Sequence, residues 1–174
     1  MNQTRQLPNG LHQTPASAQH AAREYLAFVL GAEHYAIDIL CVQEIRGYSH
    51  VTHIANAPAH IKGILNLRGV IVPILDLRIR FGNASPTYND QTIVIVLNVL
   101  NRVVGVVVDA VSDVVKIAAQ DIMPPPQLGT AALTAHIVGV ASRDERMLIV
   151  LDIQGVLADD DSHRLDLAAM VRES

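Results

Sequence analysis

The chain has 174 residues, of which 50% are hydrophobic and 17% are charged, so it can bury a sizeable core and is not disordered throughout. Aromatic residues make up only 3%, and a core of Val, Ile, Leu and Ala favours β-sheets. The formal charge of -4 provides no basic field to collect phosphates, which argues against nucleic acid or an anionic membrane as the main partner.

Residues 1–22 mix Gln, Asn, Thr, Pro, Ala and His without periodicity, which predicts a flexible N-terminal tail. They contain no continuous apolar segment, and no run of 18 apolar residues occurs anywhere in the sequence. We therefore expect a cytoplasmic protein without direct membrane insertion. Cys41 is the only cysteine, which excludes an intramolecular disulfide and favours a small buried hydrophobe over a reactive thiol.

Tyr25–Leu30 and Tyr35–Ile39 have the composition of two strands, with a turn between them. Apolar and long side chains then recur at helical spacing, which predicts one or two helical turns over Leu40–Arg46. Glu44 would lie near the C-terminus of this helix, where its charge opposes the helix dipole. We therefore expect Glu44 either to be held by another group or to be exposed for a partner.

The sequence from Ile61 to Phe81, IKGILNLRGVIVPILDLRIRF, predicts a β-hairpin. Its turn is Asn66–Gly69, because Gly69 can adopt a positive φ and β-branched residues follow it. Arg68 would then project from the hairpin tip. Asp76 is a suitable N-cap for a short helix that ends near Gly82.

The pattern of this hairpin returns without a gap at Ile137–Leu157, with Gly63 on Gly139 and Asp76 on Asp152. A weaker match relates Tyr25–Ile45 to Thr92–Val115 and places Asp38 opposite Asp109. The period is too long and the copies too few for a solenoid, so the chain is predicted to contain two tandem β modules. Their approximate bounds are 23–90 and 91–158, with a further helix over 161–172 that begins at Asp161 or Ser162.

Three histidines, His50, His53 and His60, lie close together in the sequence. No acidic residue or second cysteine completes a ligand set, so we expect no metal. No nucleophile elbow, phosphate-binding loop or stacking platform for single-stranded nucleic acid is present either. These absences argue against an enzyme, including a hydrolase built on a small β-barrel, and against a bound cofactor.

The two predicted hairpin tips differ. Arg68 is the single charge at the first tip, among apolar neighbours, whereas the second tip is Arg143–Arg146, with four charges. An arginine in an apolar setting is a frequent anchor of protein interfaces. The alternative, a solvated turn residue, is equally compatible with the sequence.

The stretch EIRGYSHVTHIANAPAHIKGILNLRGVIVPILDLRIRFG, with the strands that flank it, resembles the CheW family of bacterial chemotaxis coupling proteins over about residues 24–157. The NLRGVIVPILDLR segment carries the most specific part of this resemblance. It implies an all-β fold of two SH3-like five-stranded β-barrels packed on a shared hydrophobic core, with short helices. It also allows terminal segments to cross between the barrels.

The resemblance further implies a non-enzymatic adaptor with two partners, the cytoplasmic tip of a chemoreceptor and the regulatory domain of the histidine kinase CheA. The receptor-binding residues would be Val42, Glu44, Ile45 and Arg68, with Glu44 and Arg68 paired beside an apolar strip, and the kinase-binding residues would be Gly63 and Thr92. The alternatives are an adaptor of another chemosensory array and a detached kinase regulatory domain.

Overall fold

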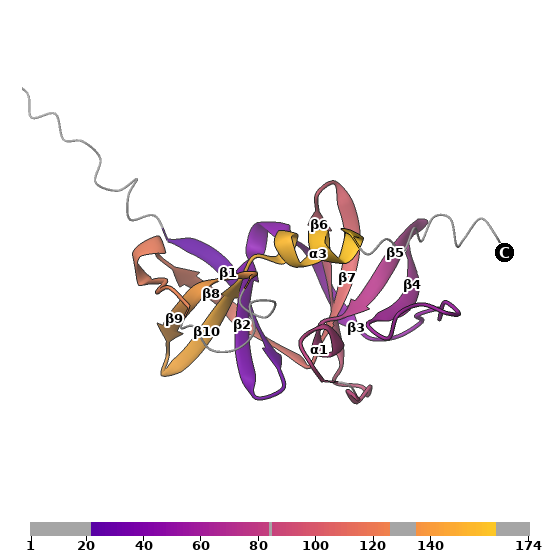
Figure 1. Cartoon of the computed structure of the whole chain (residues 1–174), viewed down its shortest axis with the longest axis horizontal. Coiled ribbons are helices and arrows are strands. Elements are labelled where there is room, and N and C mark those ends of the chain that lie inside the picture. Colours follow the sequence, from indigo (N-terminus) through magenta and orange to yellow (C-terminus); the bar gives the residue numbers. More distant parts are fainter. Residues whose placement is uncertain (1–21, 84, 126–134, 163–174) are drawn as a thin grey trace, which may run out of the picture.

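The computed structural model describes residues 22–83, 85–125 and 135–162, and the strands in these ranges form two five-stranded sheets that lie side by side (Figure 1). The predicted tail, apart from residue 22, lies outside the described residues. The predicted start of a helix at Asp161 or Ser162 is wrong, because both residues lie at the end of a helix that begins at Ile153. The rest of the predicted range 161–172 lies outside the described residues. The all-β fold with two SH3-like barrels is confirmed.

In the sheet of barrel 1, the strands follow the order β8-β1-β2-β10-β9. Its strands are β1 (Arg23–Leu30), β2 (Glu33–Asp38), β8 (Ala110–Ile117), β9 (Ile137–Arg143) and β10 (Arg146–Leu151). Barrel 2 contains the order β3-β6-β7-β5-β4. Its strands are β3 (Val42–Gly47), β4 (Ile61–Leu67), β5 (Val70–Asp76), β6 (Ile93–Val99) and β7 (Arg102–Val108).

The chain crosses between the barrels twice, after β2 and before β8. Barrel 2 is one continuous stretch, whereas barrel 1 combines the first two strands with the last three. The sequence halves 23–90 and 91–158 therefore do not coincide with the barrels. Strand β8 was not predicted, because Ser112 and Asp113 interrupt its apolar pattern.

The internal repeat is visible in the strand pairing. In barrel 2, Thr52 forms an isolated bridge with Ile64, and in barrel 1 Met123 does so with Val140, at the equivalent position of its hairpin. A side chain at Gly63 would meet the backbone of Thr52, and one at Gly139 would meet the backbone of Met123. The predicted equivalence of Gly63 and Gly139 is confirmed.

The weaker part of the repeat has a different register from the one predicted. The parallel pair β5·β7 matches Ile74 with Gly105, and the parallel pair β10·β2 matches Val150 with Ala36. Gly105 is thus the counterpart of Ala36, which places Asp38 opposite Val107. The predicted match of Asp38 with Asp109 is wrong by two residues, because both carboxylates follow similar apolar runs.

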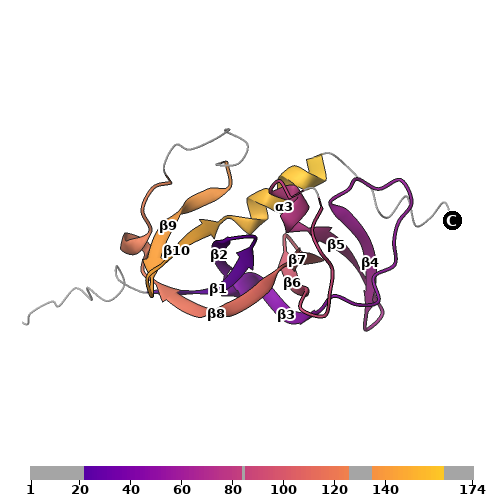
Figure 2. The same cartoon turned by 90° about the horizontal axis from the view of Figure 1, so that it is seen from below.

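Two helices follow the two equivalent hairpins. Helix α1 (Leu77–Arg80) starts after Asp76, whose Oδ1 accepts a hydrogen bond of 2.9 Å from the Arg78 N–H, as predicted for an N-cap. Helix α3 (Ile153–Ser162) starts after Asp152, whose Oδ1 accepts a hydrogen bond of 3.2 Å from the Gly155 N–H. Helix α3 is the longer of the two and lies between the barrels in both views (Figures 1 and 2).

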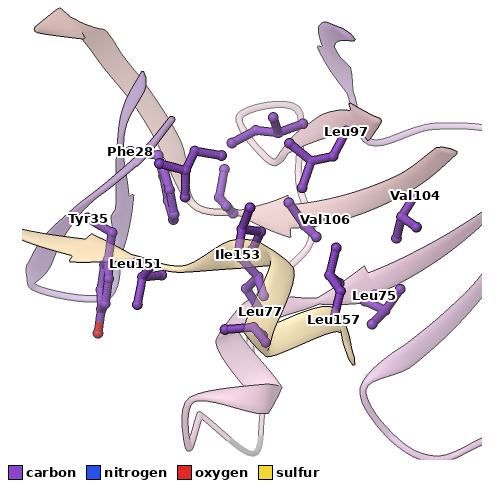
Figure 3. Packing of buried hydrophobic residues seen from close by; sticks show 14 of the residues in the cluster. Phe28, Tyr35, Leu75, Leu77, Leu97, Val104, Val106, Leu151, Ile153 and Leu157 are labelled. Atoms are coloured by element: carbon purple, nitrogen blue, oxygen red, sulfur yellow. The ribbon is translucent and has the colours of Figure 1, made fainter. Parts of the chain in front are cut away.

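The main hydrophobic core is shared by the two barrels. Phe28 and Tyr35 of barrel 1 pack with Leu97 and Val106 of barrel 2, and Ile153 of α3 lies among them (Figure 3). Burying one such side chain stabilises the fold by roughly 1.5–3 kcal/mol. Each barrel also has an interior cluster, around Ala27 and Val150 in barrel 1 and around Val94 and Val96 in barrel 2.

A buried ionic network stabilises the segment after β5. The Arg78 guanidinium donates to both carboxylate oxygens of Asp76 at 3.0 and 2.8 Å and to the Thr87 carbonyl at 2.7 Å. It also donates to Asp109 Oδ1 at 3.0 Å. Burial alone would lower the pKa of Arg78, but the bonds and charges of Asp76 and Asp109 outweigh it and raise that pKa. The Tyr88 hydroxyl donates to Asp76 as well.

Candidate protein-interaction site

Strands β3 and β4 are the two edges of the barrel 2 sheet, and contacts at two places close the barrel between them. At one end, Thr52 joins Ile64 of β4 through two backbone hydrogen bonds of 2.8 and 2.9 Å. At the other end, the tip of the β4–β5 hairpin reaches β3 through the side chain of Arg68. We call this end, defined by Glu44, Arg46 and Arg68, the barrel 2 seam.

Residues 42–47 form the strand β3, so the predicted helical turn over Leu40–Arg46 is wrong. Only Ile39–Cys41 forms one turn of 3-10 helix, and Asp38 caps it by accepting a hydrogen bond of 2.9 Å from the Leu40 N–H. The helical turn does not continue because β3 pairs with β6 over its whole length.

A β-bulge at Gln43 explains the helix-like spacing. The register shifts between Val42 and Glu44, so Val42 and Ile45, three residues apart, pair with Leu97 and Ile95 on the same face of the sheet. A regular strand would put residues three apart on opposite faces. Three of the expected receptor-binding residues, Val42, Glu44 and Ile45, therefore lie on a bulged edge strand and not on the predicted helical turn.

The bulge separates the four predicted receptor-binding residues into two faces. Val42 and Ile45 lie on the face of the shared core, where Val42 is half-buried and Ile45 is 45% exposed. Glu44 pairs with Val96 and therefore lies on the opposite face, at the seam. The structure thus brings the four residues to one edge of barrel 2, but it does not place Glu44 within the strip of Val42 and Ile45.

One carboxylate lies between two guanidinium groups at the barrel 2 seam. Arg68 Nη2 donates to Glu44 Oε2 at 2.5 Å, which confirms the predicted pairing of these two residues. Arg46 Nη1 lies 3.6 Å from Glu44 Oε1. The Arg68 side chain is 71% exposed, against 26% for Glu44. The seam therefore presents a largely exposed guanidinium group that is bound to a less exposed carboxylate of strand β3.

The hairpin turn fixes where Arg68 leaves the backbone. Arg68 and Gly69 have φ angles of 51° and 87°, as a tight two-residue hairpin turn requires. The Asn66 side chain accepts a hydrogen bond of 2.9 Å from the Gly69 N–H. The NLRG segment is therefore a turn whose geometry directs Arg68 across the seam.

Barrel 1 has an equivalent seam. Its edge strand β8 carries the same bulge, because the pairing with β1 shifts after Asp113 pairs with Ala27. Arg146, from the β9–β10 hairpin, lies 3.3 Å from Asp113. This pair does not follow from the repeat as predicted from the sequence. Aligning the segments of the two bulged edge strands, with Asp113 on Glu44, would identify it.

Comparison with known proteins identifies the family of this fold. A family model described as CheW-like domain matches residues 24–161. The chemotaxis protein CheW of Klebsiella aerogenes is 48% identical over 153 residues, which cover 88% of this chain and 92% of that protein. The chain belongs to the CheW-like family.

Other members agree with this assignment. The chemotaxis protein CheW of Rhizobium meliloti is 33% identical over 82% of this chain and 92% of its own length. The crystal structure of the scaffolding protein TtCheW from Thermoanaerobacter tengcongensis superimposes with a TM-score of 0.68 at 35% identity. It covers 76% of this chain and 85% of that one.

In this CheW-like chain, the two predicted kinase-binding residues are buried. Gly63 has a φ of 141°, and a Cβ there would lie 2.0 Å from the Thr52 carbonyl oxygen. Thr92 is 2% exposed, and its hydroxyl accepts a hydrogen bond from the Asn89 N–H. Neither residue is therefore part of the exposed surface of barrel 2. Their role in kinase binding stays a prediction, which burial restricts to an indirect effect.

The remaining candidate groups do not converge on a chemical site in the CheW-like fold. Within the described residues, no group of three or more His, Cys, Asp or Glu is arranged to hold a metal ion. His53 lines an open pocket of about 300 Å³ with Lys62 and Tyr88, whereas His50 and His60 do not line it.

Cys41 is half-buried in the 3-10 turn. Burial, with smaller contributions from the charges of Asp38 and Asp152, raises the pKa of its thiol. A raised pKa leaves less of the reactive thiolate at neutral pH, in keeping with a packing residue. Across the described parts of the chain, none of the helices is long and apolar enough to span a membrane.

Proposed function

We propose that this chain is a non-enzymatic cytoplasmic adaptor that couples chemoreceptors to the histidine kinase CheA. In this function, the barrel 2 edge with Val42, Glu44, Ile45 and Arg68 binds the cytoplasmic tip of a receptor. A second surface binds the regulatory domain of the kinase. Membership of the CheW-like family supports the adaptor function, since the family match extends over residues 24–161.

The observation that carries the receptor site is the contact between Arg68 and Glu44. An edge strand and a hairpin tip, 24 residues apart in the sequence, place a largely exposed guanidinium on a fixed carboxylate. Ile45, the next residue of β3, offers an exposed apolar side chain on the opposite face of the sheet. An arginine with apolar neighbours is the usual composition of an interface anchor.

Charge reversal of Arg68 tests the proposal. Arg68→Glu places two carboxylates together at the seam, and we expect it to weaken binding of a receptor-tip fragment by about 1–4 kcal/mol. Binding of the kinase regulatory domain should remain close to that of the wild type. Both affinities can be measured by calorimetric titration of the purified partners.

The chain provides a matched control for this variant. Arg146→Glu changes the equivalent ion pair of barrel 1, which also joins a hairpin to an edge strand. This control should leave receptor binding unchanged. Normal receptor binding by Arg68→Glu, or an equal loss with Arg146→Glu, would contradict the assignment of the site.

A further inference from the structure

Arg46 occupies an unusual place for an arginine. It pairs with Val94 on β6, so its side chain starts on the face of β3 that lines the interior of barrel 2. Its side chain is only 31% exposed, and its Nε is buried with no hydrogen-bond partner among the described residues. Leaving a buried donor unsatisfied costs about 1–3 kcal/mol. The arginine is therefore not explained by stability.

Barrel 1 shows which kind of residue the fold accommodates at the position equivalent to Arg46. Because both edge strands carry the same bulge, Asp113 is the counterpart of Glu44 and Val115 is the counterpart of Arg46. Val115 is 5% exposed and belongs to the interior cluster of barrel 1. The fold thus accommodates a buried valine at this position. Arg46 therefore occupies a position where packing alone favours an apolar side chain.

The charges at the seam are also unequal. Two guanidinium groups face the carboxylate of Glu44, and Arg68 already holds Oε2 at hydrogen-bond distance. Arg46 lies 3.6 Å from Oε1, which is an ion pair but longer than a hydrogen bond. The seam therefore keeps an excess of one positive charge and unused N–H donors on Arg46, and a carboxylate is the group that matches both.

We propose that Arg46 is a specificity-determining residue of the receptor site and that it receives a carboxylate of the partner. This inference rests on the proposed function, because it names the chemistry that the same site recognises. The acidic side chain of the partner docks at the seam and neutralises the excess charge. Glu44 orients Arg46 and Arg68 for this contact, and Ile45 supplies apolar contact on the other face of β3.

The test replaces Arg46 with the residue that the other barrel uses. Arg46→Val should fold at least as stably as the wild type in urea, because the equivalent Val115 is accommodated. Its affinity for a receptor-tip fragment should fall about tenfold or more, the usual effect of losing a hydrogen bond to a charged group. Arg46→Lys keeps the charge without the guanidinium and should retain part of the affinity.

The carboxylate is identified by a double-mutant cycle. Each Asp and Glu of the receptor-tip fragment is changed to Asn or Gln and titrated against the wild type and Arg46→Val. One of these changes should weaken binding to the wild type and have little further effect on Arg46→Val. Arg146→Val is the matched control, since its ion pair has a similar exposure of 28% and lies in barrel 1. It should leave the affinity unchanged.

The outcomes separate this inference from the proposed function. If Arg68→Glu loses receptor binding but Arg46→Val keeps it, the role of Arg46 is overturned and the adaptor function stands. If each Asp or Glu substitution in the fragment changes the affinity for the wild type and for Arg46→Val equally, Arg46 does not receive a carboxylate. If neither Arg68→Glu nor Arg46→Val affects binding, both the inference and the receptor site are wrong.

Discussion

Arg78 and Asp109 join the two barrels through one ion pair. Arg78 belongs to α1 of barrel 2, and its Nη1 lies 3.0 Å from Asp109 Oδ1 at the crossover between β7 and β8. The other carboxylate oxygen of Asp109 accepts a hydrogen bond of 2.7 Å from the Gly31 N–H of barrel 1. The Asp109 N–H donates to the Val29 carbonyl at 3.0 Å. A single carboxylate thus contacts both barrels.

Arg78→Leu should strongly destabilise the protein. The Arg78 side chain is 2% exposed and that of Asp76 is 0% exposed, so the change leaves a buried carboxylate without its cation, at a cost of about 3–5 kcal/mol. Urea denaturation measures the loss. Arg146→Leu breaks a more exposed pair and should cost less than about 1 kcal/mol. Similar losses in the two variants would mean that the Arg78 network does not stabilise the fold.

Gly63→Ala should destabilise barrel 2 by at least about 2 kcal/mol, because it combines backbone strain at a φ of 141° with a contact of 2.0 Å to the Thr52 carbonyl oxygen. Gly47→Ala is the control, since nothing lies within 4 Å of a Cβ added there, and it should change stability by less than about 0.5 kcal/mol. Thermal melting compares them. An unchanged melting temperature for Gly63→Ala would show that the segment of Thr52 moves freely.

Ionisation of the Tyr88 phenol should lower the stability of the folded protein at alkaline pH. Burial, and then the hydrogen bond to Asp76 and its charge, raise the pKa of this phenol above its usual 10.0. The folded state therefore holds the proton more tightly than the unfolded state. The stabilisation is complete below about pH 10 and is lost as the pH rises from there towards the folded-state pKa.

Urea denaturation between about pH 8 and pH 11 checks this expectation. The wild type should lose stability over the upper part of the range, and Tyr88→Phe should lose less, because it has no phenol to ionise at this site. The other three tyrosines, Tyr25, Tyr35 and Tyr48, also have raised pKa values, so part of the slope remains in the variant. Identical slopes in the two proteins would contradict the assignment to Tyr88.

Much of the fold could be predicted from sequence because its signals are local. Val70–Ile74 is β-branched and follows a glycine turn, and Asp76 precedes a short helix, so the hairpin and its cap were found correctly. The bulge at Gln43 was not found. It places Val42 and Ile45 on one face with a spacing of three, which in a sequence cannot be told from a helical turn.

The candidate site, like the fold, could be predicted only in part from the sequence. The pairing of Glu44 with Arg68 could be predicted because the family resemblance assigns both residues to one surface. Arg46 was overlooked because an arginine near the end of an expected helix needs no special reason. Its significance depends on Val115, 69 positions further along the chain, whose equivalence becomes visible only once the two edge strands are paired in three dimensions.

The two crossings of the chain between the barrels determine the order in which the barrels can form during synthesis. The five strands of barrel 2 are complete once Val108 has left the ribosome, whereas barrel 1 waits for β9 and β10. Strand β8 can already pair with β1 by then, but β2 lacks its neighbour until β10 has been made. We therefore expect barrel 2 to act as the template on which barrel 1 closes, with the last strands and α3 sealing the core between them.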